Sequence, residues 1–288
     1  ISNSNNMNNK YSLPKDGGLI AKSAPRDIIH RYEKIRTNVY ENEYRAVQYV
    51  ADNIVRAIRN YNEAHCSNGV YDETRPFVLG LTTGRTPLGL YSELVKRHKE
   101  GQISFRNVAV FSLDEFYPIR STEQQSRNYR IHEEFINHID ILPENVHIPD
   151  GTIPEERISE YCDSYERAAS RIDLMIIGVG EDGQIGFNEP GEAFELETHC
   201  VDLTPATIEA NKRFFDGNVD LVPKQAYTMG IRTIMQARKV LMVVNGAGKA
   251  EIVKKAFFGP VTPEVPASIL QLHPDFILVA DEEALSLI

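Results

Sequence analysis

The chain has 288 residues, of which 42% are hydrophobic and 25% are charged, and its formal net charge is −10. These proportions are typical of a globular protein with a sizeable core, and the length fits one large domain or two small ones. The acidic balance disfavours nucleic acid as the main partner, because its field repels a phosphate backbone. No apolar run approaches the ~20 residues that a membrane-spanning helix needs, so we expect no membrane partner.

The cysteines and the first residues bear on the compartment. Cys66, Cys162 and Cys200 are odd in number and lack metal-ligand spacing, which predicts a reducing compartment without a disulfide framework. The opening ISNSNNMNNK lacks the hydrophobic centre of a secretory signal. We therefore expect a cytoplasmic protein.

Composition divides the chain near residue 27. Residues 1–27 are rich in asparagine, serine, glycine and proline, which predicts an N-terminal extension that is flexible or strapped to the surface. Neither an internal repeat nor a linker interrupts residues 28–288, which we predict to be one domain.

Strand and helix patterns alternate along that domain. Apolar residues at helical spacing predict a first helix over residues 43–65. Short apolar runs then predict strands over residues 77–81, 108–113, 174–177, 240–244 and 276–280. Between them, helical patterns cover residues 88–99, 158–169 and 248–258. This alternation predicts an α/β fold with an open, mainly parallel sheet and helices on both faces.

Four of the predicted strands end in loops that carry polar side chains. The loops are residues 82–87 (TTGRTP), 114–115 (DE), 178–191 (GVGEDGQIGFNEPG) and 245–249 (NGAGK). In an open parallel sheet, ligands bind beyond the carboxyl ends of the strands. The sequence therefore predicts one binding cleft to which all four loops contribute.

Loop 178–191 is the most informative of the four, because its glycines permit sharp turns and close approach to a ligand. It carries Asp182, Gln184 and Glu189. A surface turn with scattered charges is the alternative interpretation.

Two other loops suit an anion. Loop 82–87 precedes a predicted helix, where free backbone amides, the helix dipole and threonine hydroxyls favour phosphate. In loop 245–249, Lys249 adds a point charge. Arg213, elsewhere in the chain, is a further candidate cation. Ordinary helix capping and a solvated helix charge are the alternatives. The spacing is not that of a nucleotide-binding P-loop, so ATP is not inferred.

Asp114 and Glu115 are adjacent at a strand end. Because side chains alternate along a strand, we expect only one of them to face the cleft. Capping of the next segment is the alternative role.

The ordered motifs LGLTTG (79–84), SLDE (112–115), GFNEP (186–190) and ASILQLH (267–273) resemble the glucosamine-6-phosphate deaminase/isomerase family. The likeness runs from about Val39 to the end of the chain. Related 6-phosphogluconolactonases share the fold and a similar Gly-Asp-Gly loop, but FNEP resembles the deaminase branch. The resemblance implies a Rossmann-like fold, a homo-oligomer, no metal or organic cofactor, and conversion of glucosamine 6-phosphate to fructose 6-phosphate and ammonia.

The resemblance also implies roles for individual residues. Asp114 matches the base that moves a proton from carbon 2 to carbon 1 of the opened sugar. The positions that bind the 6-phosphate match Thr83, Gly84, Thr86, Arg213 and Lys249. The two carboxylates that hold the ring-opening histidine of the family match Asp182 and Glu189.

Three positions depart from the family pattern. The histidine position is Gln184, whose amide can hydrogen-bond but cannot exchange a proton at neutral pH. Losing one general acid–base group typically costs ~10²–10⁴ in rate. Arg85 stands where glycine is common and can either strengthen phosphate binding or fill space. The segment 126–129 (SRNY) replaces a frequent Ser-Tyr.

Three functions therefore remain open from the sequence. The first is a deaminase/isomerase whose ring opening is slow and is left to Glu189, Asp182 or water. The second is a non-catalytic, regulatory sugar-phosphate-binding domain. The third is a lactonase or another sugar-phosphate enzyme.

Overall fold

A seven-stranded parallel sheet forms the centre of the computed structural model, which describes residues 35–288 except for the side chains of Arg85 and Thr86. The predicted extension, residues 1–27, and its boundary lie outside the described residues. The strand order is β1-β12-β11-β8-β4-β5-β7, and each neighbouring pair is parallel. The strands are β1 (Arg36–Tyr40), β4 (Phe77–Leu81), β5 (Val108–Ser112), β7 (Val146–His147), β8 (Leu174–Ile177), β11 (Val240–Val244) and β12 (Phe276–Asp281).

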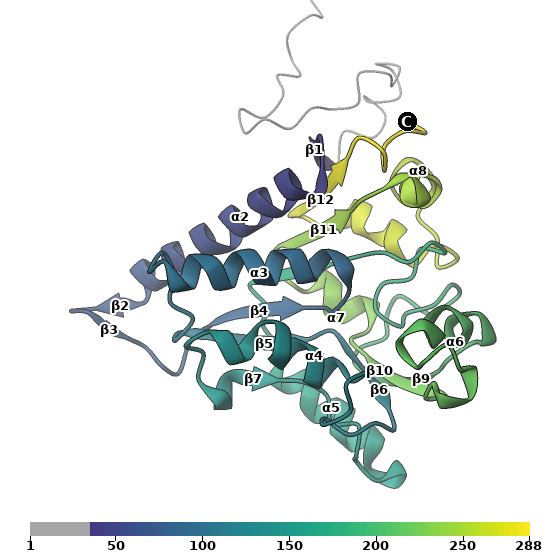
Figure 1. Ribbon diagram of the computed structural model, residues 1–288, viewed down its shortest axis with the longest axis horizontal. Helices are drawn as coiled ribbons and strands as arrows, with labels where there is room; N and C mark the ends of the chain where they lie inside the picture. The colour runs from purple at the N-terminus through teal and green to yellow at the C-terminus, as the bar shows by residue number, and fades with distance from the viewer. Residues whose placement is uncertain (1–34) are drawn as a thin grey trace, which may run out of the picture.

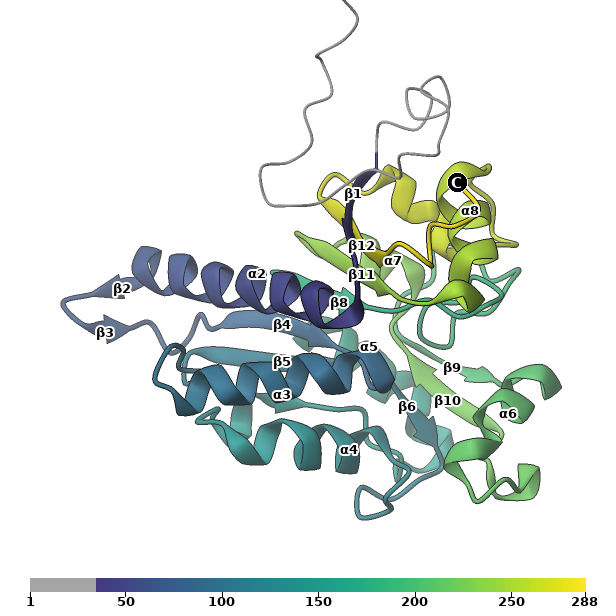
Figure 2. The same cartoon turned by 45° about the horizontal axis from the view of Figure 1, so that its top comes forward.

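Helices cover both faces of this sheet (Figures 1 and 2). One face packs against α2 (Glu43–Ala64), α3 (Arg85–Lys99) and α4 (Arg127–Glu134). The other packs against α5 (Ile158–Ala168), α7 (Ile231–Met235) and α8 (Ala250–Phe258). The expected Rossmann-like α/β architecture is thereby confirmed.

The central strands were predictable because both of their faces are buried. In β8, Leu174 and Ile176 enter the core beneath α2 and α3, whereas Met175 and Ile177 enter the core on the opposite face. A strand buried on both sides reads as a continuous apolar run rather than an alternating one.

A second sheet was not predicted. It is antiparallel with strand order β6-β10-β9, and its strands are β6 (Asp114–Tyr117), β9 (His199–Asp202) and β10 (Gln225–Thr228). The prediction that one strand spans residues 108–113 is therefore wrong at its end. β5 stops at Ser112, and the chain passes into β6, which pairs with β10 rather than with the main sheet. Asp114 thus begins a strand instead of lying in a free loop.

Shorter elements complete the described chain. A hairpin of β2 (Cys66–Ser67) and β3 (Val70–Tyr71) follows α2, and α6 (Pro205–Asn211) lies beside the second sheet. The 3-10 helices are η1 (Ile136–His138), η2 (Pro143–Asn145), η3 (Glu155–Arg157), η4 (Lys212–Phe214), η5 (Val219–Leu221), η6 (Ala247–Lys249) and η7 (Pro266–Leu272). In residues 35–288, none of the helices combines the length and the apolar character needed to cross a bilayer.

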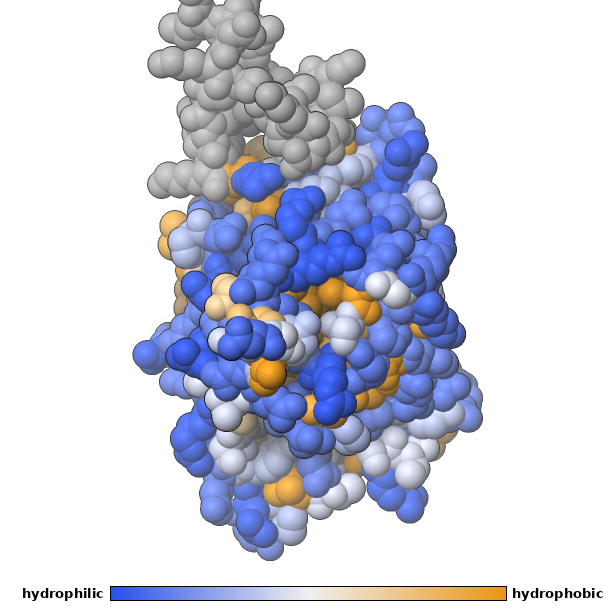
Figure 3. Space-filling model, turned by 90° about the vertical axis from the view of Figure 1, so that its left-hand side faces the viewer, coloured by the Kyte–Doolittle hydropathy of each residue, from blue (hydrophilic) through white to orange (hydrophobic). Residues whose placement is uncertain are grey.

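The strand order places a crevice at one edge of the main sheet. After β4 the chain adds β5 and β7 on one side, and it then returns to β8 on the other side of β4. Such a reversal opens a ligand crevice beyond the carboxyl ends of the two central strands. The amino-end side, where the β2–β3 hairpin projects, is largely hydrophilic with scattered hydrophobic residues (Figure 3).

Candidate active site

A cleft of about 630 Å³ lies at the carboxyl edge of the sheet. Its wall includes Thr83 after β4, Asp114 after β5, Gln184 after β8 and Lys249 after β11. The predicted convergence of four loops on one cleft is therefore confirmed. A volume of this order is typical of small-molecule sites.

One part of the cleft wall has features that suit an anion. Thr83 and Gly84 lie there immediately before α3, a 15-residue helix whose first amides and dipole face that part. Gly84 has a φ of +140°, which glycine adopts without strain. Arg85 and Thr86 form the first turn of α3, but their side chains lie outside the described part, so their phosphate contacts stay predictions.

Two cations line the same cleft. Lys249, at the end of η6, donates a hydrogen bond from Nζ to the Val179 carbonyl at 2.7 Å. Burial lowers the pKa of the Lys249 ammonium group; Arg213 lowers it further, whereas Glu181 and Asp182 oppose the shift. An anion beside Lys249 and Arg213 would relieve both the burial cost and the repulsion between the cations.

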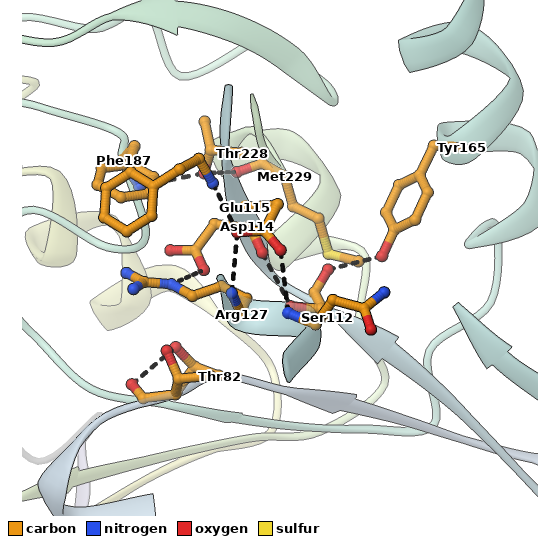
Figure 4. A network of polar contacts seen from close by, with 12 residues as sticks. Thr82, Ser112, Asp114, Glu115, Arg127, Tyr165, Phe187, Thr228 and Met229 are labelled. Atoms are coloured by element: carbon orange, nitrogen blue, oxygen red, sulfur yellow. Dashed lines mark hydrogen bonds and ion pairs between the residues drawn. The ribbon is translucent and has the colours of Figure 1, made fainter. Parts of the chain in front are cut away.

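The cleft wall also contains an ion pair. Asp114 is only 3% exposed, and its Oδ1 accepts a hydrogen bond from Nε of Arg127 at 3.2 Å (Figure 4). The Arg127 guanidinium lies over the Phe116 ring at 4.6 Å and near the Phe187 ring at 5.5 Å. Both members of the ion pair line the cleft.

The Glu115 carboxylate, in contrast, binds backbone N–H groups. Its carboxylate accepts hydrogen bonds at 2.9 Å from the backbone N–H groups of Phe116, Arg127 and Asn128, two of which begin α4. Burial raises the pKa of Glu115 to about 7, against the effect of those hydrogen bonds. The expectation that only one of the adjacent carboxylates faces the cleft is confirmed, and that one is Asp114.

Loop 178–191 is fixed to the second sheet. The Phe187 N–H donates to Thr228 Oγ1 at 3.2 Å, and Asn188 Nδ2 donates to the carbonyls of Ile185 and Met229 at 2.8 and 2.7 Å. Gly186 has a φ of +58°, and an added Cβ would lie 2.7 Å from Thr228 Oγ1. A side chain at Gly186 would therefore displace the loop.

Gln184 turns its amide group toward Asp182. Its Nε2 donates to the two Asp182 carboxylate oxygens at 3.1 and 3.3 Å. Because a carboxylate only accepts, the Gln184 carbonyl oxygen is left as the acceptor for a ligand. Glu189 is arranged differently from the expectation: it is buried and accepts from Thr204, at the start of α6, rather than from Gln184. Neither carboxylate lines the cleft.

The family is decided by comparison with known proteins. A family model described as "Glucosamine-6-phosphate isomerases/6-phosphogluconolactonase" matches residues 42–278. The chain belongs to this family. A glucosamine-6-phosphate deaminase of Thermoanaerobacter pseudethanolicus is 48% identical over 214 residues, which cover 73% of this chain and 83% of that protein. The deaminase of Clostridioides difficile is 45% identical over 212 residues, covering 73% and 84%.

Solved structures of the family agree with the fold. A monomeric glucosamine-6-phosphate deaminase aligns with a TM-score of 0.79 and 34% identity, covering 88% of this chain and all of that one. A 6-phosphogluconolactonase of Thermotoga maritima aligns at 0.65 with 22% identity, covering 86% of this chain and all of that one. The second likeness concerns the fold alone.

Arg127 is the member of this family site to which sequence analysis gave no role. The segment SRNY was recognised as a departure, but the ion pair with Asp114 depends on how α4 packs against β6. No local pattern encodes that contact. Among residues 35–288, no group of three or more His, Cys, Asp or Glu side chains is arranged to hold a metal ion.

Proposed function

We propose that this protein converts glucosamine 6-phosphate to fructose 6-phosphate and ammonia. The observation that carries the proposal is that Asp114 and the cations Lys249 and Arg213 line one cleft of about 630 Å³. Curated relatives with 45–48% identity are named glucosamine-6-phosphate deaminases. The cleft therefore combines an anchor for a phosphate with a base for the reacting carbons.

The anion end holds the 6-phosphate. Thr83, Gly84, Lys249 and Arg213 contribute from the cleft wall, and we expect Arg85 and Thr86 to contribute from the first turn of α3. Binding energy at the phosphate orients carbons 1 and 2 toward Asp114, which converts affinity into rate.

Asp114 moves the proton. It takes the proton from carbon 2 of the open sugar, the electron pair enters the carbon 1–carbon 2 bond, and the carbonyl pair moves onto oxygen 1, which takes a proton from solvent to give an enolamine. Return of the proton to carbon 1 leaves an iminium group at carbon 2. Water hydrolyses that group to the ketone and releases ammonia.

Ring opening is the slow part of this proposal. Gln184 lines the cleft and can accept a hydrogen bond from the carbon 1 hydroxyl, but it cannot exchange a proton. Because neither Asp182 nor Glu189 lines the cleft, solvent carries that proton, and Asp182 acts by holding the Gln184 amide.

The test is ammonia release from glucosamine 6-phosphate by the wild type, Gln184→His and Asp114→Asn. We expect turnover by the wild type, faster turnover by Gln184→His, and almost none by Asp114→Asn. Circular dichroism confirms that each variant is folded. If folded wild type and Gln184→His both fail to release ammonia, the proposed function is wrong.

The two other functions left open by the sequence are not favoured. The named relatives of 45–48% identity are enzymes, which disfavours a purely regulatory role. The lactonase likeness is 22% identical and concerns the fold alone. Turnover of 6-phosphogluconolactone without ammonia release would reverse this ranking.

Assembly and location complete the proposal. A homo-oligomer in the cytoplasm, without a cofactor, is what the family resemblance and the cysteine pattern predict. A solved relative is described as monomeric, so light scattering on the purified protein decides between one subunit and several.

A further inference from the structure

The Arg127 guanidinium is held in one orientation inside the cleft. Its Nε donates a hydrogen bond to Asp114 Oδ1 at 3.2 Å (Figure 4), and its Cζ lies 4.6 Å from the centre of the Phe116 ring and 5.5 Å from that of the Phe187 ring. The side chain is 12% exposed, and it lines the cleft. Among the side chains that the structure describes, Asp114 is its one hydrogen-bond partner, so both Nη groups remain free to donate.

The start of α4 also has hydrogen bonds of its own. The backbone N–H of Arg127 is already bound by Glu115, and Ser126 caps the helix by accepting from the Tyr129 N–H at 2.9 Å. The Arg127 side chain thus lies beside the base at a helix start whose backbone is capped by other residues. Its position implies a role in the chemistry.

Proton transfer changes the charge that Arg127 faces. Asp114 is an anion before it takes a proton and is neutral afterwards, while an equal negative charge appears on the substrate. The guanidinium keeps its charge throughout, because arginine is not deprotonated in proteins. A fixed cation beside the base thus loses one anionic partner at the moment when a second one forms nearby.

We propose that Arg127 is a catalytic residue that binds the developing enolate oxygen of the substrate when Asp114 takes the carbon-2 proton. This inference rests on the proposed function. The carbon 2–hydrogen bond breaks, and its proton goes to the Asp114 carboxylate. The electron pair forms the carbon 1–carbon 2 double bond, and the carbonyl pair moves onto oxygen 1. The free Nη groups of Arg127 donate hydrogen bonds to that oxygen until it takes up a proton from solvent.

Two substitutions separate charge from shape. Arg127→Met keeps an unbranched aliphatic side chain but removes the charge, and Arg127→Lys keeps the charge but removes the planar fork. The matched control is Arg130→Met. Arg130 lies on the same helix, pairs with Glu134 at 3.4 Å and lies over the Phe214 ring at 5.5 Å, but it does not line the cleft.

The experiment measures kcat and KM for ammonia release from glucosamine 6-phosphate with hydrogen or deuterium at carbon 2. For Arg127→Met we expect kcat to fall by about 10², the usual loss when one oxyanion donor is removed. KM should change less than about threefold, because the interaction forms only in the transition state. The carbon-2 isotope effect should increase, because proton transfer becomes rate-limiting. Arg127→Lys should regain part of kcat, and Arg130→Met should match the wild type.

The outcomes are distinguishable. If Arg127→Met keeps the wild-type kcat and isotope effect while the wild type turns over, the role of Arg127 is refuted and the proposed function stands. If its KM rises while kcat is unchanged, Arg127 binds the ground state only, and the inference also fails. If the folded wild type releases no ammonia, both proposals fail.

Discussion

The two parts of the proposed site, an anion end and a reacting end for the bound sugar, are built on different principles. The proposed anion end consists of a helix start and two cations, and attraction of a phosphate to such groups needs little geometric detail. The reacting end uses one carboxylate in an ion pair, aligned by two aromatic rings and by a loop bonded to the second sheet. The residues of the anion end could be predicted from short sequence motifs, whereas the contacts of the reacting end depend on tertiary packing.

This difference implies that substitutions at the two ends should separate kinetically. Loss of phosphate contacts should weaken binding, because those contacts exist before and during the reaction. Loss of contacts at the reacting end should slow turnover, because they change when the proton moves. A phosphate-contact substitution that mainly lowers kcat, or a reacting-end substitution that mainly raises KM, would contradict this comparison.

The largest effect is expected at Asp114. Asp114→Asn removes the base and should lower kcat for ammonia release by about 10²–10⁴, with KM little changed. Asp163→Asn is a matched control, because Asp163 is exposed on α5 outside the cleft. Nearly normal turnover by Asp114→Asn would assign the proton transfer to another group.

At Lys249 we expect a smaller effect, on KM rather than on kcat. Lys249→Met should raise KM by about 10- to 100-fold, the range for losing a charge-assisted hydrogen bond, and leave kcat within about threefold. Lys254→Met, an exposed change on α8, is the control. A fall in kcat without a change in KM would place Lys249 at the reacting end.

The anion end should also respond to pH. Burial lowers the pKa of the Lys249 ammonium group, so Lys249 loses its charge at a lower pH than an exposed lysine does. As pH rises through that value, KM for the sugar phosphate should increase. Lys249→Arg should move the increase to higher pH, since arginine stays charged. Identical KM profiles for both proteins would contradict this.

The smallest effect concerns Glu115 and stability. Burial raises its pKa from the ordinary 4.5 to about 7, so between these pH values the unfolded chain ionises before the folded one. Stability should therefore fall as pH rises through this window, by on the order of 3 kcal/mol at most. Above the window the loss is complete.

Glu115→Gln cannot ionise and should lack this contribution. Its free energy of unfolding, measured with urea from about pH 4 to pH 8, should vary less with pH than that of the wild type. Glu144→Gln, at an exposed site, should follow the wild type. Parallel curves for all three proteins would show that Glu115 titrates normally.

The sequence predicted the parts of the fold that local pattern encodes. The strands β4, β8 and β11 were predicted at their observed bounds, because burial on both faces makes them continuous apolar runs. The second sheet was missed, because β6, β9 and β10 have four residues each and pair across distant parts of the chain.

The site divides in the same way. Thr83, Gly84, Asp114, Gln184, Arg213 and Lys249 were predicted, and all of them line the cleft. The contacts of Glu189 with Thr204 and of Arg127 with Asp114 were not predicted. Both contacts form where the second sheet and its helices pack onto the loops. Such packing cannot be predicted from a local hydrophobic pattern.

The most direct test of the central claim, that one cleft grips the phosphate and presents the base, is a crystal structure of Asp114→Asn with glucosamine 6-phosphate. We predict the phosphate between the start of α3, Lys249 and Arg213, with carbon 2 in contact with residue 114. A sugar phosphate bound with its phosphate at Arg127, or outside this cleft, would contradict the account.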